Sequence, residues 1–273
     1  MKNKVSIFNF SGIYDNESFY RNDKSSICVG VQEEISFEIV DCREIPGTNC
    51  MCDDVAMDTI RDRIHAAGIG AGEIHFIDNG NYHYMSAIML EQVKEPCSLV
   101  VFDHHPDMQP PMFGDILSCG GWVLYALEYS SFIRDVHIIG ADRKLIEELP
   151  EDVRSRAFFY DVSDVMRGVN GNVMDSVGAE IVLPKTRYPV YLSIDKDVVV
   201  DSELTTNWDQ GEMSTAMLCA VVRKLFSESE IIGVDICGEC APDQEGIDVG
   251  AAIAGNDAFN GQLLEIISMS NGC

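Results

Sequence analysis

Aspartate and histidine residues follow two apolar runs of the sequence at spacings that suit metal binding. The run Ser98–Phe102 leads into DHHPD (103–107), and the run Val190–Ile194 leads into DKD (195–197). Alternate residues of extended backbone project to the same side, so we expect Asp103, His105 and Asp107 to converge on one point. The same spacing predicts that Asp195 and Asp197 point together.

Two further apolar runs lead to polar residues of the same kinds. Ile74–Ile77 is followed by His83, and Ile231–Val234 is followed by Glu239. A lone histidine or a lone D-x-D is more often structural, but four such strand ends together favour a metal site. Crowded carboxylates raise one another's pKa unless cations are present. Two divalent ions would compensate, and a mixed carboxylate and imidazole set suits Mn²⁺, Fe²⁺, Co²⁺ or Zn²⁺.

The elements that must position these residues alternate between strand and helix. Strand–helix alternation with nearly all-apolar strands predicts an α/β fold with three α/β/α layers and a mostly parallel central sheet of about eight strands. Function in such sheets lies at the carboxyl ends of the strands. No linker divides residues 1–273, so we expect a single domain. The expected strands are Val5–Phe10, Ile27–Val31, Phe37–Val40, Ile74–Ile77, Leu99–Phe102, Val136–Ile139, Phe158–Tyr160, Val190–Ile194 and Ile231–Val234. The expected helices are Asp54–Ala67, Tyr82–Val93, Gly121–Tyr129, Ser214–Phe226 and Phe259–Met269, and Gly168–Gly178 reads as a loop.

Composition restricts the partners. The 19 basic and 45 acidic residues give a formal net charge of −26, which disfavours nucleic acid and anionic membranes and attracts a small cationic substrate. No secretory signal or bilayer-spanning run is visible. The ten cysteines form no disulfide framework, so we expect reduced thiols in the cytoplasm.

The motifs, taken in order, resemble those of the ureohydrolases, the family of arginase and agmatinase. That family has a histidine in a Gly-Gly-Asp-His-Ser-like segment, then D-x-H-x-D, then S-x-D-x-D, then a glutamate shortly before a proline. The first appears loosely here as NGNYHYMS (79–86), and the second is complete at 103–107. The third is complete as SIDKD (193–197), and the fourth is ECAP (239–242). The resemblance covers residues 74–242.

The resemblance implies a ligand set and a cofactor. One metal would be held by His83, Asp103, Asp107 and Asp195, and the other by Asp103, His105, Asp195 and Asp197. Asp103 and Asp195 would bridge the two ions. Family members use two Mn²⁺ ions around a bridging hydroxide, so Mn²⁺ is the expected cofactor. The resemblance also suggests a homo-oligomer, either a trimer or a hexamer.

Two segments depart from the family pattern. Many members carry a histidine in a His-Gly-x-Pro segment, where this chain reads SCGGW (118–122) and places Cys119. The segment ADRK (141–144) does not reproduce the acidic contacts by which arginases hold the substrate amino group. The metal site therefore matches the family, while the residues that would read the substrate differ from those of arginase.

The expected reaction is hydrolysis of a C–N bond in a linear guanidine or amidine, by attack of the bridging hydroxide. Glu239 would hold the planar N–H edge of the substrate by a charge-assisted hydrogen bond, and Asp107 would carry a proton to the leaving amine. Two alternatives stay open. The chain could be a weakly active or inactive metal-binding relative with a regulatory role, or a metal-dependent deacetylase of the same fold. The acidic charge argues against phosphoesters.

Overall fold

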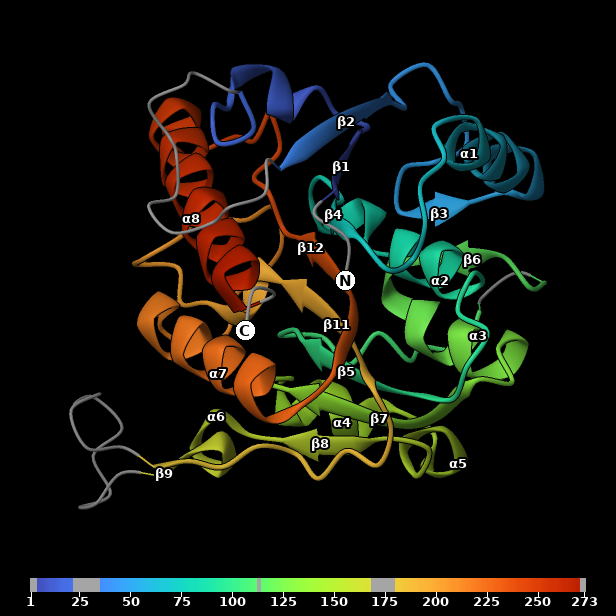
Figure 1. The fold of residues 1–273 in the computed structure, drawn as a ribbon, viewed down its shortest axis with the longest axis vertical. Coiled ribbons are helices and arrows are strands. Elements are labelled where there is room, and N and C mark those ends of the chain that lie inside the picture. Colours follow the sequence, from blue (N-terminus) through green and yellow to red (C-terminus); the bar gives the residue numbers. More distant parts are fainter. Residues whose placement is uncertain (1–3, 22–34, 112–113, 168–179, 271–273) are drawn as a thin grey trace.

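The computed structural model describes residues 4–21, 35–111, 114–167 and 180–270. Its centre is an eight-stranded sheet in which every neighbouring pair is parallel, in the order β2-β1-β4-β12-β11-β5-β7-β8 (Figure 1). The strands are β1 (Lys4–Asn9), β2 (Ser36–Asp41), β4 (Ile74–Phe76), β5 (Cys97–Phe102), β7 (Ile133–Ile139), β8 (Phe158–Tyr160), β11 (Val190–Asp195) and β12 (Ile231–Cys237).

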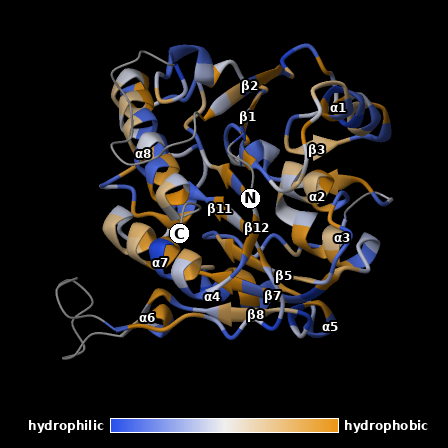
Figure 2. Cartoon of the chain, in the orientation of Figure 1, coloured by the Kyte–Doolittle hydropathy of each residue, from blue (hydrophilic) through white to orange (hydrophobic). Residues whose placement is uncertain are grey.

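Helices cover both faces of the sheet and complete three layers. Side chains alternate along each strand, so Leu99 and Val101 pack on one face while Val100 and Phe102 pack on the other. Hydrophobic colour accordingly runs through the central strands (Figure 2). The first face packs against α1 (Asp54–Ala66), α2 (Met85–Leu90) and α3 (Trp122–Tyr129). The second packs against α7 (Thr215–Glu228) and α8 (Val249–Ser270). The predicted α/β/α architecture is confirmed.

Short elements connect these layers. The two-residue strands β3 (Met51–Cys52) and β6 (Leu117–Ser118) pair antiparallel outside the main sheet, as do β9 (Met166–Arg167) and β10 (Glu180–Ile181). The remaining helical turns are η1 (Ile13–Asn16), η2 (Gly80–Tyr82), η3 (Cys119–Gly121), α4 (Arg143–Glu148), α5 (Glu151–Arg154), α6 (Val162–Val165) and η4 (Lys196–Val198). None of the helices in the described ranges combines the length and apolarity needed to cross a bilayer.

Most predicted elements are confirmed within a few residues. The expected strand Ile27–Val31 and the expected loop Gly168–Gly178 lie outside the described residues. The helix expected over Tyr82–Val93 is shorter, because its first turn is the 3-10 helix η2. The last helix begins at Val249, ten residues before the expected Phe259. Its first turns contain glycine and alanine, which leave little apolar periodicity to detect.

The four apolar runs that lead to acidic or histidine residues are four adjacent central strands. They are β4, β12, β11 and β5, which lie side by side in this order. Because they are parallel, their carboxyl ends meet at one edge of the sheet. The topology therefore brings residues from four distant parts of the chain to one place.

Candidate metal centre

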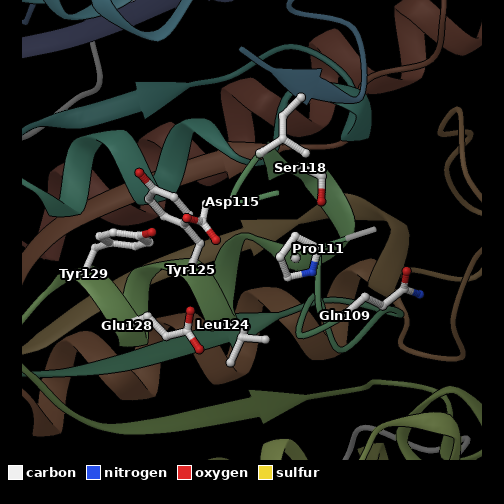
Figure 3. Close-up of a pocket in the computed structure, with 10 residues that line it drawn as sticks. Gln109, Pro111, Asp115, Ser118, Leu124, Tyr125, Glu128 and Tyr129 are labelled. Carbon is white, nitrogen blue, oxygen red and sulfur yellow. The ribbon is translucent and has the colours of Figure 1, made fainter. Parts of the chain in front are cut away.

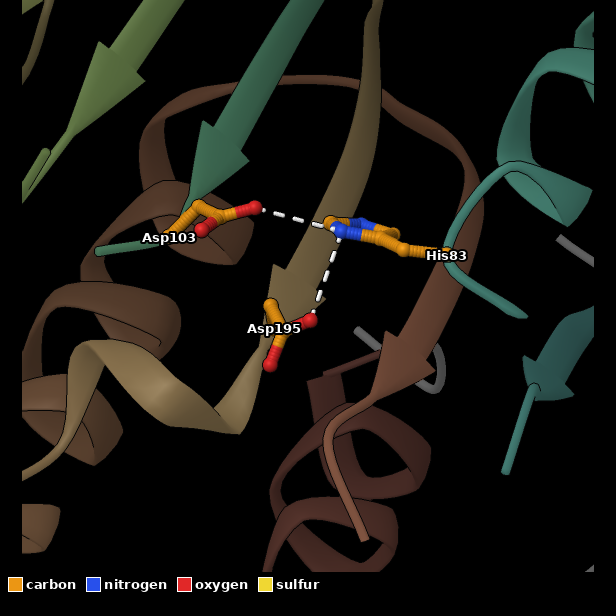
Figure 4. Close-up of side chains that lie close together, drawn as sticks. All are labelled: His83, Asp103 and Asp195. Carbon is orange, nitrogen blue, oxygen red and sulfur yellow. Dashed lines mark ion pairs between the residues drawn. The ribbon is translucent and has the colours of Figure 1, made fainter. Parts of the chain in front are cut away.

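His83 and two aspartates form one buried group of potential ligands. His83 comes from the loop after β4, Asp103 directly follows β5, and Asp195 ends β11. His83 Nδ1 lies 3.2 Å from Asp103 Oδ2 and 3.4 Å from Asp195 Oδ2 (Figure 4). All three side chains are buried, and one ligand atom from each lies within 4.8 Å of the others. This is the size of a cluster that can surround one cation.

A second group shares Asp103 with the first. His105 Nδ1 lies 2.9 Å from Asp197 Oδ2 and 3.4 Å from Asp103 Oδ1. Ligand atoms of these three residues also lie within 4.8 Å of one another. Asp103 thus turns one oxygen toward each histidine. The two groups of potential ligands therefore have one carboxylate in common.

Backbone N–H groups hold one oxygen of each ligand carboxylate. Asp103 Oδ1 accepts from His105 N at 2.6 Å, and Asp195 Oδ1 accepts from Asp197 N at 2.9 Å. Asp197 Oδ1 accepts from His104 N at 2.9 Å. In each carboxylate the other oxygen, Oδ2, faces a histidine of the centre. The backbone therefore orients the ligands before any cation binds, which lowers the cost of forming the site.

Asp107 joins the first group through a turn. Its Oδ2 lies 3.2 Å from His83 Nδ1 and accepts a 2.7 Å hydrogen bond from Trp122 Nε1. Its φ of 48° lies in the left-handed region, which non-glycine residues rarely adopt. Asp103 and Asp107 face His83, whereas His105 faces Asp103 and Asp197, so the three residues meet around two points and not the single predicted one. The extended backbone used in the prediction is not found, because the chain bends at His104 and His105. Likewise, Asp197 is placed by the 3-10 helix η4.

The buried carboxylates of this centre repel one another, which favours bound cations. Burial and the charge of Asp197 raise the pKa of Asp195 to about 8, and burial and Asp103 raise that of Asp197 to about 6. Burial lowers the pKa of His83, but the surrounding carboxylates outweigh burial and leave the pKa well above its ordinary value. Within the described chain, His83 Nδ1 and Asp103 Oδ2 are buried without a hydrogen-bond partner. These residues fit divalent cations, which would satisfy both atoms.

Each of the two histidines makes a further contact through its other ring nitrogen, Nε2, which orients the ring. His83 Nε2 lies 2.9 Å from Ser193 Oγ, the serine of the S-x-D-x-D motif, which turns Nδ1 toward the carboxylates. His105 Nε2 lies 3.2 Å from Asp209 Oδ1. Sequence reasoning missed Asp209 and Trp122 because neither belongs to a recognisable motif. Trp122, only three residues after Cys119, could have been found by asking what anchors Asp107.

A cavity of about 270 Å³ opens above the ligands. Ligand side chains of both groups line its floor, and its walls are largely apolar. The wall residues include Met51, Pro110, Ile116, Leu145 and Trp208, together with Cys50 and Cys119. A neighbouring pocket between Gln109 and α3 measures only about 20 Å³, room for about one water (Figure 3). The larger cavity is therefore the candidate substrate site.

Glu239 stands two residues beyond β12, and its side chain contacts residues of the protein interior. Its side chain is buried, pairs with the buried Lys196 ammonium, and accepts a 2.8 Å hydrogen bond from Asn260 Nδ2. Glu239 is not among the described residues of the cavity wall. Lys196 stands between the ligands Asp195 and Asp197, and its side chain reaches Asn260 of α8. The assignment of Glu239 to substrate binding stays a prediction. In the structure its carboxylate forms a buried ion pair with Lys196.

A second glutamate adjoins this ion pair. Asn260 Nδ2 also donates to Glu17 Oε2 at 2.9 Å. Burial, and then the charge of Glu239, raise the pKa of Glu17 to about 10. Glu17 is therefore protonated near neutral pH. The four side chains Glu17, Lys196, Glu239 and Asn260, called here the buried quartet, link the ligand segment to α8.

Comparisons with known proteins agree with this geometry. The model of the arginase family matches residues 24–258. An uncharacterized protein of Thermotoga maritima is 31% identical over 169 residues, which are 62% of this chain and 59% of that relative. The chain thus matches less than two thirds of that relative's length.

Solved structures show the same fold. A hypothetical agmatinase from Burkholderia thailandensis has a TM-score of 0.63 at 17% identity, covering 99% of this chain and 87% of that one. Proclavaminate amidino hydrolase from Streptomyces clavuligerus has a TM-score of 0.65 at 16% identity, covering 98% and 92%. Formimidoylglutamase from Bacillus subtilis has a TM-score of 0.63 at 13% identity, covering 97% and 87%. With the family model matched over most of its length, the chain belongs to the arginase family.

Proposed function

We propose that this chain is a binuclear metal-dependent hydrolase that cleaves a C–N bond of a linear guanidine or amidine. The observation that carries the proposal is a pair of potential ligand groups, one buried and one with a partly exposed histidine, that share Asp103 below a cavity. His83, Asp103, Asp107 and Asp195 would hold one ion, and Asp103, His105, Asp195 and Asp197 the other. Mn²⁺ is the proposed metal, because the set combines hard carboxylate oxygens with imidazole.

Two divalent ions bound there supply Lewis acidity and a water that ionises near neutral pH. The chain itself supplies position and proton transfer. Asp107 lines the cavity and is our proposed proton carrier to the leaving amine. The indole N–H of Trp122 holds its Oδ2 in place, and the apolar walls limit competing water. These contacts fit a reaction that moves a proton within a confined site.

Recognition of a cationic substrate needs an anionic or aromatic partner. Trp208 lines the cavity and offers an indole ring, to which guanidinium groups bind favourably. The protein's net charge of −26 also favours a cation. Glu239 would serve only if substrate displaced Lys196 from its carboxylate. Trp208 is therefore the cation partner best supported by position.

A metal-dependent deacetylase of the same fold is the second candidate. The observation in its favour is that Lys196 already neutralises Glu239. Apart from the ligands themselves, the described residues of the cavity wall carry no charged side chain. Such walls suit a neutral amide at least as well as a cation, because a buried cation needs a counter-charge.

Metal analysis with a substrate panel tests the proposal. Wild-type protein prepared with Mn²⁺ should contain two ions per chain. Asp103→Asn should lose both, whereas Asp197→Asn should lose only one. Asp58→Asn, which alters an exposed carboxylate paired with Arg61 on α1, is the matched control and should keep two. One ion or none in the wild type would contradict the binuclear site.

The panel should contain guanidines, amidines and N-acetylated amines. Turnover of guanidines or amidines that disappears in Asp103→Asn supports the proposal. Turnover of acetylated amines alone would replace it with the deacetylase. Full metal occupancy without turnover of any compound would instead select the regulatory alternative.

A further inference from the structure

Two cysteines face each other at the wall of the metal cavity. Met51 pairs with Ser118 and Cys52 with Leu117 across the antiparallel β3–β6 pair. Continued by one residue, this register places Cys50 opposite Cys119, and Cys119 N donates a 2.9 Å hydrogen bond to Cys50 O. Both residues line the cavity. Their positions are thus fixed by backbone pairing and not by loose loops.

These two thiols differ from the other cysteines in accessibility. Of the eight cysteines in the described ranges, six are buried, and only Cys50 and Cys119 are partly exposed. A reagent that enters the cavity can therefore reach both. The buried cysteines behave as small apolar core residues and are protected from such reagents.

The backbone geometry suits a cross-strand link. A backbone hydrogen bond from Cys119 N to Cys50 O holds the two residues together, and a hydrogen bond between their thiols gives the proximity that a disulfide needs. Cys50 also has a φ of 60°, an unusual conformation for a residue with a side chain. Such backbone is found where the surrounding structure imposes it, often at functional sites.

The two thiols differ in reactivity. A hydrogen bond from Cys119 lowers the pKa of Cys50 to about 7, although partial burial opposes this. The same hydrogen bond, and then burial, raise the pKa of Cys119. The lowered pKa favours the thiolate at Cys50, and the greater burial of Cys119 favours its protonated form.

We propose that Cys50 and Cys119 form a redox-modification site, in which a hydroperoxide converts the two thiols into a disulfide across the cavity wall. The Cys50 thiolate attacks one peroxide oxygen and the O–O bond breaks. The other oxygen takes up a proton from solvent and leaves as water from hydrogen peroxide, or as an alcohol from an organic hydroperoxide. Cys50 is now a sulfenic acid, oxidised by two electrons. The Cys119 sulfur then attacks Cys50 sulfur, and the hydroxyl leaves as water with the Cys119 proton.

The disulfide would connect the residue before β3 to η3, the segment just before the residue that donates a hydrogen bond to the proposed ligand Asp107. Cys119 begins η3, which leads directly into Trp122 and its hydrogen bond to Asp107. Gly120 O also accepts a 2.9 Å hydrogen bond from Gln109 N, near the same ligand. Oxidation therefore acts on a wall of the proposed active site. Formation of the disulfide itself does not depend on hydrolase activity, so the proposed function can fail without affecting this site.

Peroxide treatment and thiol mapping test the proposal. The full-length protein is treated with hydrogen peroxide, alkylated, digested and analysed by mass spectrometry. Two of its ten thiols should be lost, one cross-linked peptide should join Cys50 to Cys119, and dithiothreitol should restore both thiols. The Cys28→Ser/Cys273→Ser variant serves as the background control and should form the same link.

Single variants separate the two roles. In Cys119→Ser the sulfenic acid at Cys50 should persist and react with dimedone. In Cys50→Ser the remaining Cys119 thiol should react several-fold more slowly than Cys50 does in Cys119→Ser, because burial still raises its pKa once the hydrogen bond to Cys50 is lost. A wild type that retains ten thiols under peroxide, or one whose disulfide joins other cysteines, would overturn the proposal. So would over-oxidation of Cys50 with Cys119 left free.

Discussion

Replacing Lys196 by methionine removes the ammonium group of the buried quartet while keeping a side chain of similar length. Both partners of the Lys196–Glu239 pair have almost no exposed surface. Without Lys196, Glu239 keeps only neutral partners, Asn260 Nδ2 at 2.8 Å and the carboxyl group of Glu17. Removing one member of a buried ion pair costs about 3–5 kcal/mol. We expect Lys196→Met to lower the free energy of unfolding by that amount.

The double variant Lys196→Met/Glu239→Leu should cost far less than the sum of its single substitutions. Two apolar side chains replace the charges, and an apolar pair is often as stable as the ion pair it replaces. The remaining loss comes from Asn260, whose buried amide would lose its contacts with both partners. That loss is worth about 1–3 kcal/mol.

Urea unfolding of the manganese-loaded protein measures these differences. Lys224→Met is the matched control, because Lys224 pairs with Glu228 on the partly exposed surface of α7 and should contribute less than about 0.5 kcal/mol. Near wild-type stability of Lys196→Met, or strictly additive losses in the double variant, would refute the reasoning. The kinetics of Glu239→Gln separate its role in the buried ion pair from a role in substrate binding. If Glu239 contacts a cationic substrate, kcat/KM should fall by the equivalent of about 2–5 kcal/mol in transition-state binding.

Two further predictions concern pH. The folded pKa of Asp195, about 8, exceeds its unfolded value, so the chelated protein should lose stability as pH rises toward 8. Thermal unfolding at pH 6 and pH 8 should show this fall without metal but not with Mn²⁺, and equal falls in both would contradict it. Glu17→Gln should raise the Tm at pH 8. Glu17, with a folded pKa of about 10, stays protonated in the folded protein but ionises freely in the unfolded chain, so it destabilises the fold more as pH rises. The gain should shrink at pH 5, and a lower Tm at pH 8 would show that the carboxylate is needed.

The sheet and the clustering of the candidate ligands could be predicted because both depend on local patterns. The central strands are mostly apolar, and Asp103 and Asp195 stand directly at the carboxyl ends of β5 and β11, so short segments carry the information. The paths by which the ligands converge were not predictable in the same way. The left-handed turn at Asp107 depends on Trp122 and Val123, which hold its side chain and carbonyl from a neighbouring helix.

Glu239 shows where local patterns stop being informative. Its spacing from β12 and the following proline predict a position at the sheet edge, and that position is correct. The direction of its side chain depends on Lys196 and on Asn260 of α8, which are distant in sequence. A buried lysine between two acidic ligands gave one clue, since such a charge needs a partner. Only the folded chain identifies Glu239 as that partner.

The shared ligand Asp103 also has a mechanical consequence. The two groups that share it bring together residues that follow β4 and β5 and the last residue of β11, strands that are far apart along the chain but lie within four neighbouring positions of the sheet. A fluctuation that lifts any of these strand ends would take a ligand away from a cation. Bound ions should therefore oppose every such opening at once, so that amides of the three strands gain protection from hydrogen exchange together. The metal centre would then set the size of the cooperative unit at the middle of the sheet.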